Sequence, residues 1–310
     1  MRRLKAFLRA AAIPAAILLC AAGSVSGQAT REMVQVAKDV QVFTGAGSNS
    51  GFVVTDEGVL VFDSDIRNND LPAIRKVTNK KVTYLFASHA SGDHSTGAFY
   101  FREDKPVYIG TRDQIRAYFQ HELKEFEDRK KQGAAGYTTP GAVLGPPSMG
   151  FDNDLTVLFG GLTFQAKAEG YGHTGGDMTL YIPQRRVMFM GDLLNNELHP
   201  GQAEAAGVFY AHIQGTIDIL NNIINRNLPV DTYVPGHGPV HVGRGIADVV
   251  DQRDYFILMR DEVAKMVAAG KTLDEILKEF KVPARFAHYQ PGRLPGILRL
   301  FYNQLIDRGL

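Results

Sequence analysis

The sequence has almost no cysteine: Cys20 is the only one in 310 residues. It lies in an N-terminal segment that we expect to be removed during export. The mature chain then has no disulfide to form and no thiolate to offer a metal, which is compatible with a bacterial periplasm. A metal site in this protein therefore has to be built from His, Asp or Glu.

The sequence also has little net charge, formally +1, and no run of basic residues interleaved with aromatics after the N-terminus. It therefore gives no electrostatic reason to expect binding to nucleic acid or to an anionic membrane surface. With 45% hydrophobic and 22% charged residues, the composition is that of a soluble globular protein with a substantial core. We expect its partner to be a small molecule.

The N-terminus has the pattern of a signal peptide over residues 1–29. Basic Arg2, Arg3 and Lys5 precede an apolar run at residues 10–22, and Gly27-Gln28-Ala29 offers a cleavage site. The alternative is a retained membrane anchor, but the apolar run is short for a span. We expect a periplasmic or secreted protein without stable membrane insertion after cleavage.

Short strand patterns and helical patterns alternate along the rest of the chain. Residues 40–43, 51–54, 59–62, 82–87 and 106–110 predict strands, and residues 69–79 and 111–131 predict helices. Gly160-Gly161 between two apolar runs is a hairpin signal. This alternation favours a layered α/β fold.

The chain divides into two parts after the signal segment. Residues 30–243 carry the strand patterns, and residues 244–310 are predicted to be helical. Two roles stay open for this C-terminal segment: packing on the first part as a cap, or forming a homodimer.

Residues 89–94, His-Ala-Ser-Gly-Asp-His, place three metal-binding side chains directly after a strand-like run. These are His89, Asp93 and His94. Neutral imidazole and carboxylate are suitable ligands for a divalent ion such as zinc.

Three later segments end in the same way, with an apolar run followed by a glycine turn. These turns carry His173, Asp192 and His237. Functional groups in layered α/β folds gather beyond the carboxyl ends of strands. The alternative is that these are unrelated, hydrogen-bonded core residues. A shared metal site explains the clustering more directly.

With these segments in order, the chain resembles the metallo-β-lactamase superfamily over about residues 40–238. The motif of that family is H-x-H-x-D-H, and its later ligands match His173, Asp192 and His237. The resemblance implies a four-layer αββα sandwich with metals at one edge. It implies His89 and His173 at a first metal, Asp93, His94 and His237 at a second, and Asp192 between them.

Ser91 departs from the family pattern because it stands where the second His of the motif is expected. A hydroxyl is a poor zinc ligand beside imidazole. We therefore expect one firmly bound zinc at Asp93, His94, Asp192 and His237, and a weaker or empty first site.

The resemblance implies a hydrolase in which metal-activated water attacks an ester, lactone, thioester or β-lactam-type bond. Asp93 is predicted to orient the water, and His89 and His173 to act as base or to position it. The alternative is a degenerate, weakly active or non-catalytic metal- or ligand-binding member of the same fold. Candidate pocket residues are Ser91, Asn49, His199 and Tyr210.

Overall fold

The structure is a computed structural model that describes residues 31–45, 47–201 and 211–307. The predicted signal peptide and the pocket candidate Tyr210 lie outside these residues. Within the described ranges, no helix is long and apolar enough to cross a membrane.

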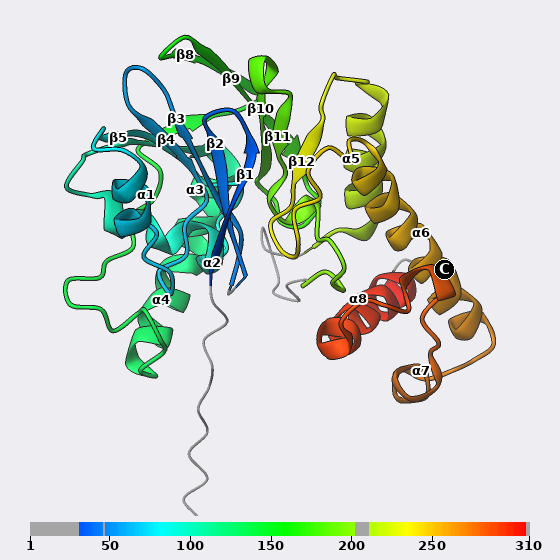
Figure 1. Ribbon diagram of the computed structural model, residues 1–310. Helices are drawn as coiled ribbons and strands as arrows, with labels where there is room; N and C mark the ends of the chain where they lie inside the picture. Colours follow the sequence, from blue (N-terminus) through cyan, green and yellow to red (C-terminus); the bar gives the residue numbers. More distant parts are fainter. Residues whose placement is uncertain (1–30, 46, 202–210, 308–310) are drawn as a thin grey trace, which may run out of the picture.

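The first sheet has seven strands in sequential order, β1 to β7 (Figure 1). The pairs from β1 to β4 are antiparallel, and β4 to β7 run parallel. The strands are β1 (Glu32–Ala37), β2 (Val40–Thr44), β3 (Ser50–Val54), β4 (Val59–Phe62), β5 (Val82–Phe86), β6 (Val107–Thr111) and β7 (Met149–Phe151).

The second sheet has five strands in the order β12-β11-β10-β9-β8. They are β8 (Asp154–Phe159), β9 (Leu162–Gly170), β10 (Asp177–Ile182), β11 (Val187–Phe189) and β12 (Thr232–Val234). The predicted hairpin joins β8 to β9. Gly160 and Gly161 have φ angles of 53° and 77°, the left-handed pair that a type I′ turn requires.

Helices cover the outer face of each sheet. On the first sheet lie α1 (Leu71–Val77), the short α2 (Gly92–Ser95), α3 (Arg112–Ala117) and α4 (Leu123–Lys131); on the second lie α5 (Ile213–Asn225) and α6 (Ala247–Ala268). Thr111 begins α3 with a capping box that includes Gln114, as the sequence predicts for the helix after residue 110.

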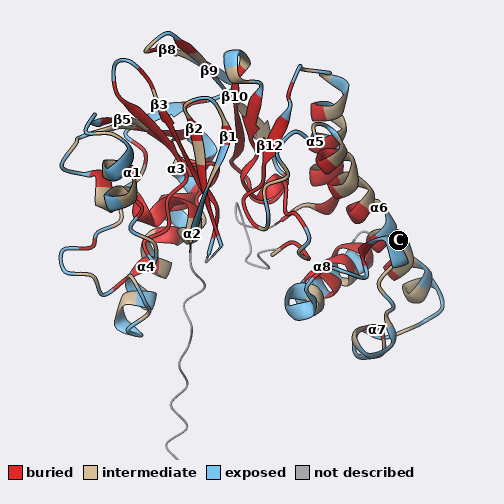
Figure 2. Ribbon diagram, viewed as in Figure 1, coloured by how far each residue is buried: buried red, intermediate tan, exposed pale blue. Residues whose placement is uncertain are grey.

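Three groups of buried side chains hold these layers together. One lies between the sheets and includes Phe62 and Phe189, whose stacked rings are 5.0 Å apart. The other two join a sheet to its helices. Figure 2 shows the central strands of the sheets in red, as buried, whereas much of the outer strands β1 and β8 is intermediate or exposed. The predicted αββα sandwich is confirmed.

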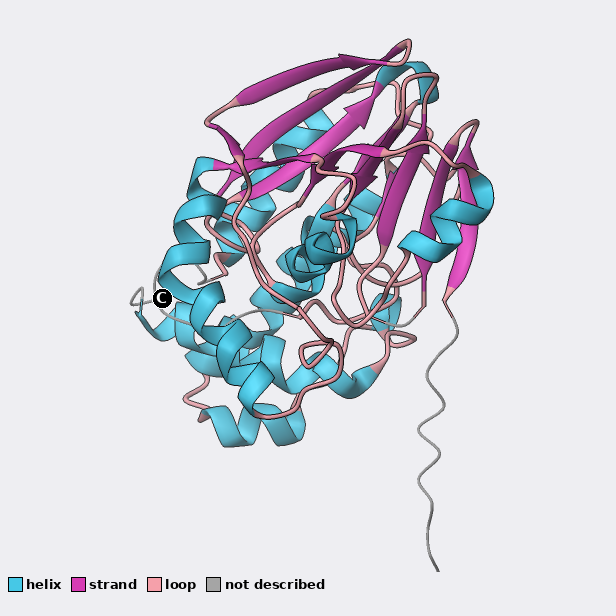
Figure 3. Ribbon diagram, turned by 90° about the vertical axis from the view of Figure 1, so that its left-hand side faces the viewer, coloured by secondary structure: helices cyan, strands magenta, loops and turns pink. Residues whose placement is uncertain are grey.

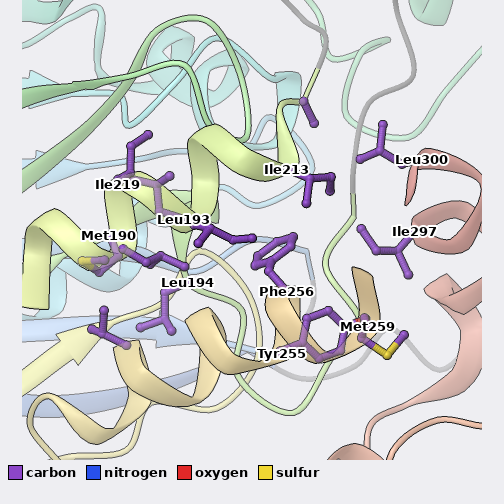
Figure 4. Close-up of a cluster of buried hydrophobic side chains, with 14 of the residues drawn as sticks. Met190, Leu193, Leu194, Ile213, Ile219, Tyr255, Phe256, Met259, Ile297 and Leu300 are labelled. Atoms are coloured by element: carbon purple, nitrogen blue, oxygen red, sulfur yellow. The ribbon is translucent and has the colours of Figure 1, made fainter. Parts of the chain in front are cut away.

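The C-terminal segment continues from α6 into α7 (Leu273–Glu279) and α8 (Leu294–Asp307). These helices gather at one end of the sandwich, away from the outer strands (Figure 3). In the core, Phe256 of α6 and Ile297 of α8 belong to the same cluster as Leu193, which follows β11 (Figure 4). The C-terminal helices thus share their core with the loop that carries Asp192.

Candidate metal centre

The strand ends that the sequence singles out meet at one edge of the sandwich. His89 follows β5, and Asp93 and His94 lie in α2. His173 follows β9, and Asp192 lies in the 3₁₀ turn after β11. His237 follows β12, which runs parallel to β11, so the two strands deliver their terminal residues to the same place. All six predicted ligands are therefore brought together.

One subset of these side chains forms a compact group of nitrogen and oxygen atoms. In Asp93, His94 and His237, one potential ligand atom of each lies within 4.8 Å of the others. His237 Nε2 is 3.2 Å from Asp93 Oδ2, and His94 Nε2 is 3.2 Å from Asp192 Oδ1. This is the set that the sequence predicts for the firmly bound zinc.

A second subset shares His94 with the first and adds His89 and Asp192, with one potential ligand atom of each within the same 4.8 Å limit. His173 lies beside it, with Nε2 3.5 Å from Asp192 Oδ2 and its ring 4.7 Å from that of His89. Asp192 thus lies between the two subsets, as the family resemblance implies.

Hydrogen bonds fix which nitrogen of each imidazole faces the centre. His94 Nδ1 lies 2.8 Å from Asp63 Oδ2, and His237 Nδ1 lies 3.2 Å from the carbonyl oxygen of Gly47. Since both partners can only accept, each Nδ1 carries a proton, so Nε2 is the nitrogen of each ring that a metal can bind once the proton on it is displaced.

His89 is oriented in the same way, with Nδ1 2.8 Å from the hydroxyl oxygen of Ser88. Ser88 itself donates to Asp63, so it accepts from His89. Among the described residues, the buried His89 Nε2 has no hydrogen-bond partner, and Asp192 Oδ1 makes no hydrogen bond of good geometry although His94 Nε2 lies 3.2 Å away. Buried polar atoms normally have partners, so these two atoms fit a bound metal ion.

Two glycines allow the strand ends to approach this closely. A Cβ on Gly236 would lie 2.1 Å from Asp192 Oδ1, and one on Gly191 would lie 2.4 Å from the Ser88 side chain. Gly191 also has a φ of +52°. Any other residue at these positions would push Asp192 and Ser88 away from the histidines.

The ligands strongly affect each other's protonation in the metal-free protein. Burial alone lowers the pKa of His237, but Asp192 and Asp93 together raise it to about 9. Burial likewise opposes charge on His94, yet the surrounding carboxylates raise its pKa well above the usual value. Burial, with His94 nearby, lowers the pKa of His89. Protons on two histidines therefore hold the positive charge that a metal would supply.

Ser91 lies at the N-cap of α2, where its hydroxyl does not cap the helix. It lines a cavity of about 520 Å³ that opens onto Asp93, His173, Asp192 and His237. Ser91 is in neither compact ligand group. At the position where an imidazole is expected, the chain places a small hydroxyl that faces the cavity.

Two predicted pocket residues lie elsewhere. Asn49 is 4% exposed, and its amide donates to the carbonyls of Pro235 and Gly238, so it supports the turn of His237. His199 is 1% exposed, and its Nδ1 is 2.7 Å from the Tyr255 hydroxyl oxygen. Packing of the 193–201 loop against α6 buries it in an aromatic cluster.

Several residues around the centre were not predicted. Asp63 comes directly after strand β4, just as the predicted ligands come after other strands. The strand-end pattern could therefore have identified it. The cavity wall comes mainly from elements whose sequence gives no functional signal: it includes Arg67, His121, Glu122, Arg129, Tyr137 and Arg293.

Comparison with known proteins agrees with this geometry. The model of the metallo-beta-lactamase superfamily matches residues 43–243. A linear primary-alkylsulfatase of Pseudomonas sp. (strain ATCC 19151) is 23% identical over 274 residues, covering 78% of this chain and 50% of the relative. A metallo-beta-lactamase type 2 of Elizabethkingia meningoseptica is 26% identical over 201 residues, covering 63% of this chain and 70% of the relative.

Two solved structures show the same fold. The inverting sec-alkylsulfatase Pisa1 from Pseudomonas sp. has a TM-score of 0.68 at 18% identity, covering 88% of this chain and 50% of its own. A metallo-beta-lactamase from Pontibacter korlensis has a TM-score of 0.55 at 17% identity, covering 73% of this chain and 99% of its own. The chain spans about half the length of the alkylsulfatases it matches. With six ligand positions meeting at the sandwich edge, the chain belongs to the metallo-beta-lactamase superfamily.

Proposed function

We propose that this protein is an exported zinc-dependent hydrolase acting on a small molecule with an ester-type bond. The observation that carries the proposal is the compact group Asp93, His94 and His237, completed by Asp192 and open to a cavity. Superfamily membership supports metal-dependent hydrolysis as the reaction type. Export rests on the pattern of residues 1–29.

His94, His237, Asp93 and Asp192 would hold the firmly bound zinc, and His89 and His173 would hold a weaker second ion. Bound zinc supplies a Lewis acid and lowers the pKa of water towards about 7. Asp93 is the most exposed carboxylate of the group, at 28% of its side chain, so it can accept a hydrogen bond from water in the cavity. His173 borders the same cavity and His89 packs against His173, so the two imidazoles can accept or position a proton.

The arginines that line the cavity indicate what charge the substrate carries. Arg293 borders both this cavity and a neighbouring one of about 660 Å³. Arg67 is paired with Asp65 and Arg129 with Glu125, whereas Arg293 has no carboxylate partner among the residues that the structure describes. An unpaired guanidinium favours a substrate with an anionic group. Alkyl sulfate esters, the substrate class in the name of one relative, are therefore a second candidate beside carboxylic esters.

The test is a substrate panel on the purified protein, with zinc and with chelator. It includes chromogenic carboxylic esters, a lactone, a thioester, a cephalosporin and a linear alkyl sulfate. We expect turnover of at least one class that chelator abolishes and added zinc restores. Asp192→Asn, which removes the carboxylate between the two groups, should lower that rate by at least 100-fold.

Absence of chelator-sensitive turnover on the whole panel, in protein shown to contain zinc, would overturn the proposal. That result would favour the non-catalytic metal- or ligand-binding alternative. Identification of the mature N-terminus by mass spectrometry tests export separately: a chain that retains residues 1–29 contradicts it.

A further inference from the structure

Tyr137 is a buried part of the cavity wall that no ligand role explains. It is 4% exposed and lies in the loop between α4 and β7. Its ring packs against Phe126 at 5.3 Å, and the guanidinium carbon of Arg129 lies 5.7 Å from its centroid. Contacts on the ring therefore fix where the hydroxyl points.

The hydroxyl reaches the segment that carries the metal ligands. A Cβ added to Gly92 would lie 2.8 Å from Tyr137 Oη, so the close approach depends on glycine at this position. Gly92 stands between Ser91 and Asp93. The phenol is thus held beside the motif in which a serine replaces the expected histidine.

The O–H group of Tyr137 donates to no acceptor among the described residues. Tyr137 makes no side-chain hydrogen bond with any residue in the described ranges, whereas the nearby Tyr100 hydroxyl donates to the Ile66 carbonyl at 2.7 Å. Burial raises the pKa of Tyr137 to about 12, against the lowering effect of Arg129, so the phenol keeps its proton at neutral pH. A nearly buried O–H without an acceptor, facing a cavity, indicates an acceptor in the ligand.

We propose that Tyr137 Oη, with the hydroxyl of Ser91 from the same cavity wall, forms an oxyanion subsite that donates hydrogen bonds to a negatively charged oxygen of the substrate. The inference rests on the proposed hydrolase function and extends it by naming Tyr137 as a catalytic residue. The oxygen gains charge during attack, so the donor acts most strongly in the transition state. Arg67 does not fill this role, because Asp65 and Asp93 already occupy its guanidinium.

The main test is Tyr137→Phe, which removes the donor and keeps the packed ring. We expect kcat on the best substrate to fall about 100-fold, the loss typical of one oxyanion donor, with KM nearly unchanged. Thermal stability and zinc content should stay at wild-type values. Tyr100→Phe is the matched control, since it removes a neighbouring hydroxyl that does not line the cavity, and its kcat should be unchanged.

A binding measurement keeps the inference testable without turnover. Phenylphosphonate carries tetrahedral anionic oxygens, and its affinity for zinc-loaded protein can be measured by calorimetry. We expect Tyr137→Phe to weaken binding about 10-fold or more and Tyr100→Phe to leave it unchanged. Equal affinity of wild type and Tyr137→Phe, or no binding to wild type, would overturn the subsite. Tyr137-dependent binding without turnover of any substrate would instead retain the subsite and reject the proposed hydrolase.

Discussion

His94 Nδ1 lies 2.8 Å from Asp63 Oδ2, and both side chains are almost fully buried. The carboxylate fixes the proton on Nδ1 and leaves Nε2 for the metal. Asp63 also has a φ of 61°, a conformation that Asn tolerates better than most residues. Asp63→Asn therefore removes the charge and presents an amide donor to His94 with little backbone strain.

We expect Asp63→Asn to lower zinc affinity about 10- to 100-fold, the usual effect of losing such a partner. Competition with a chromophoric zinc chelator measures it. Asp65→Asn provides the comparison, because Asp65 is equally buried but pairs with Arg67. If Asp63→Asn binds zinc as tightly as wild type, the contact of Asp63 with His94 does not control how His94 binds zinc.

Ser91 should decide how many zinc ions the protein retains. We expect wild type to keep one zinc per chain after dialysis, because the His89 and His173 pair lacks a third imidazole. Ser91→His adds that imidazole and should raise the retained zinc to two. Elemental analysis of both proteins tests this; two tightly held ions in wild type would contradict it.

Zinc binding should release protons at neutral pH. In the metal-free protein the pKa of His237 is raised to about 9, so this group is mostly protonated at pH 7. Zinc displaces that proton from Nε2. Calorimetric titrations in buffers of different ionisation enthalpy should show net release at pH 7 that declines above pH 9. A heat of binding independent of buffer at pH 7 would contradict it.

The same shift predicts the pH dependence of the metal-free protein. Because the pKa of His237 is raised on folding, the stabilisation from its proton is fully present below about pH 6.5, the unfolded value. That stabilisation is lost as the pH rises through about 9. Urea unfolding of chelator-treated protein should show a lower free energy of unfolding at pH 9.5 than at pH 6.5, and zinc-loaded protein should depend less on pH over this range.

Arg293 should contribute to binding of anionic substrates only. Loss of a charge-assisted hydrogen bond of about 1.5 kcal/mol or more corresponds to roughly a 10-fold rise in KM. We therefore expect Arg293→Ala to raise KM for an alkyl sulfate or a carboxylate-bearing ester, but not for an uncharged ester. Arg299→Ala, an exposed arginine of α8 outside the cavity wall, is the control. Equal effects on charged and neutral substrates would argue against charge recognition.

Arg31 and Asp70 provide a test of how burial changes the cost of breaking an ion pair. Their side chains are 14% and 8% exposed and lie 2.9 Å apart, and Asp70 also accepts from Ser50. Arg31→Ala leaves Asp70 poorly solvated, which should cost about 3 kcal/mol of unfolding free energy. The exposed pair of Arg186 and Asp231 is the comparison, and Arg186→Ala should cost under about 1 kcal/mol. Equal costs in urea unfolding would contradict the role of burial.

The sequence alone determined the fold class, and it predicted six ligand positions whose side chains the structure brings together. Strand and helix periodicity are local properties, and residues such as His89 and Asp192 are marked by the apolar runs and glycine turns beside them. Export and the role of the C-terminal segment as a separate unit stay predictions. The tertiary structure decided which atoms face the centre, because Asp63 and Gly47 lie 31 and 190 residues from the histidines they orient.

The cavity wall was likewise decided only by tertiary packing. Tyr137 lies in a glycine- and proline-rich loop without periodicity, and its hydroxyl reaches Gly92 only because the loop folds back over α2. Asn49 and His199 have polar side chains in plausible loops, yet packing buries them away from the cavity. Local pattern predicts which residues follow a strand, whereas long-range contacts determine which of them the substrate can reach.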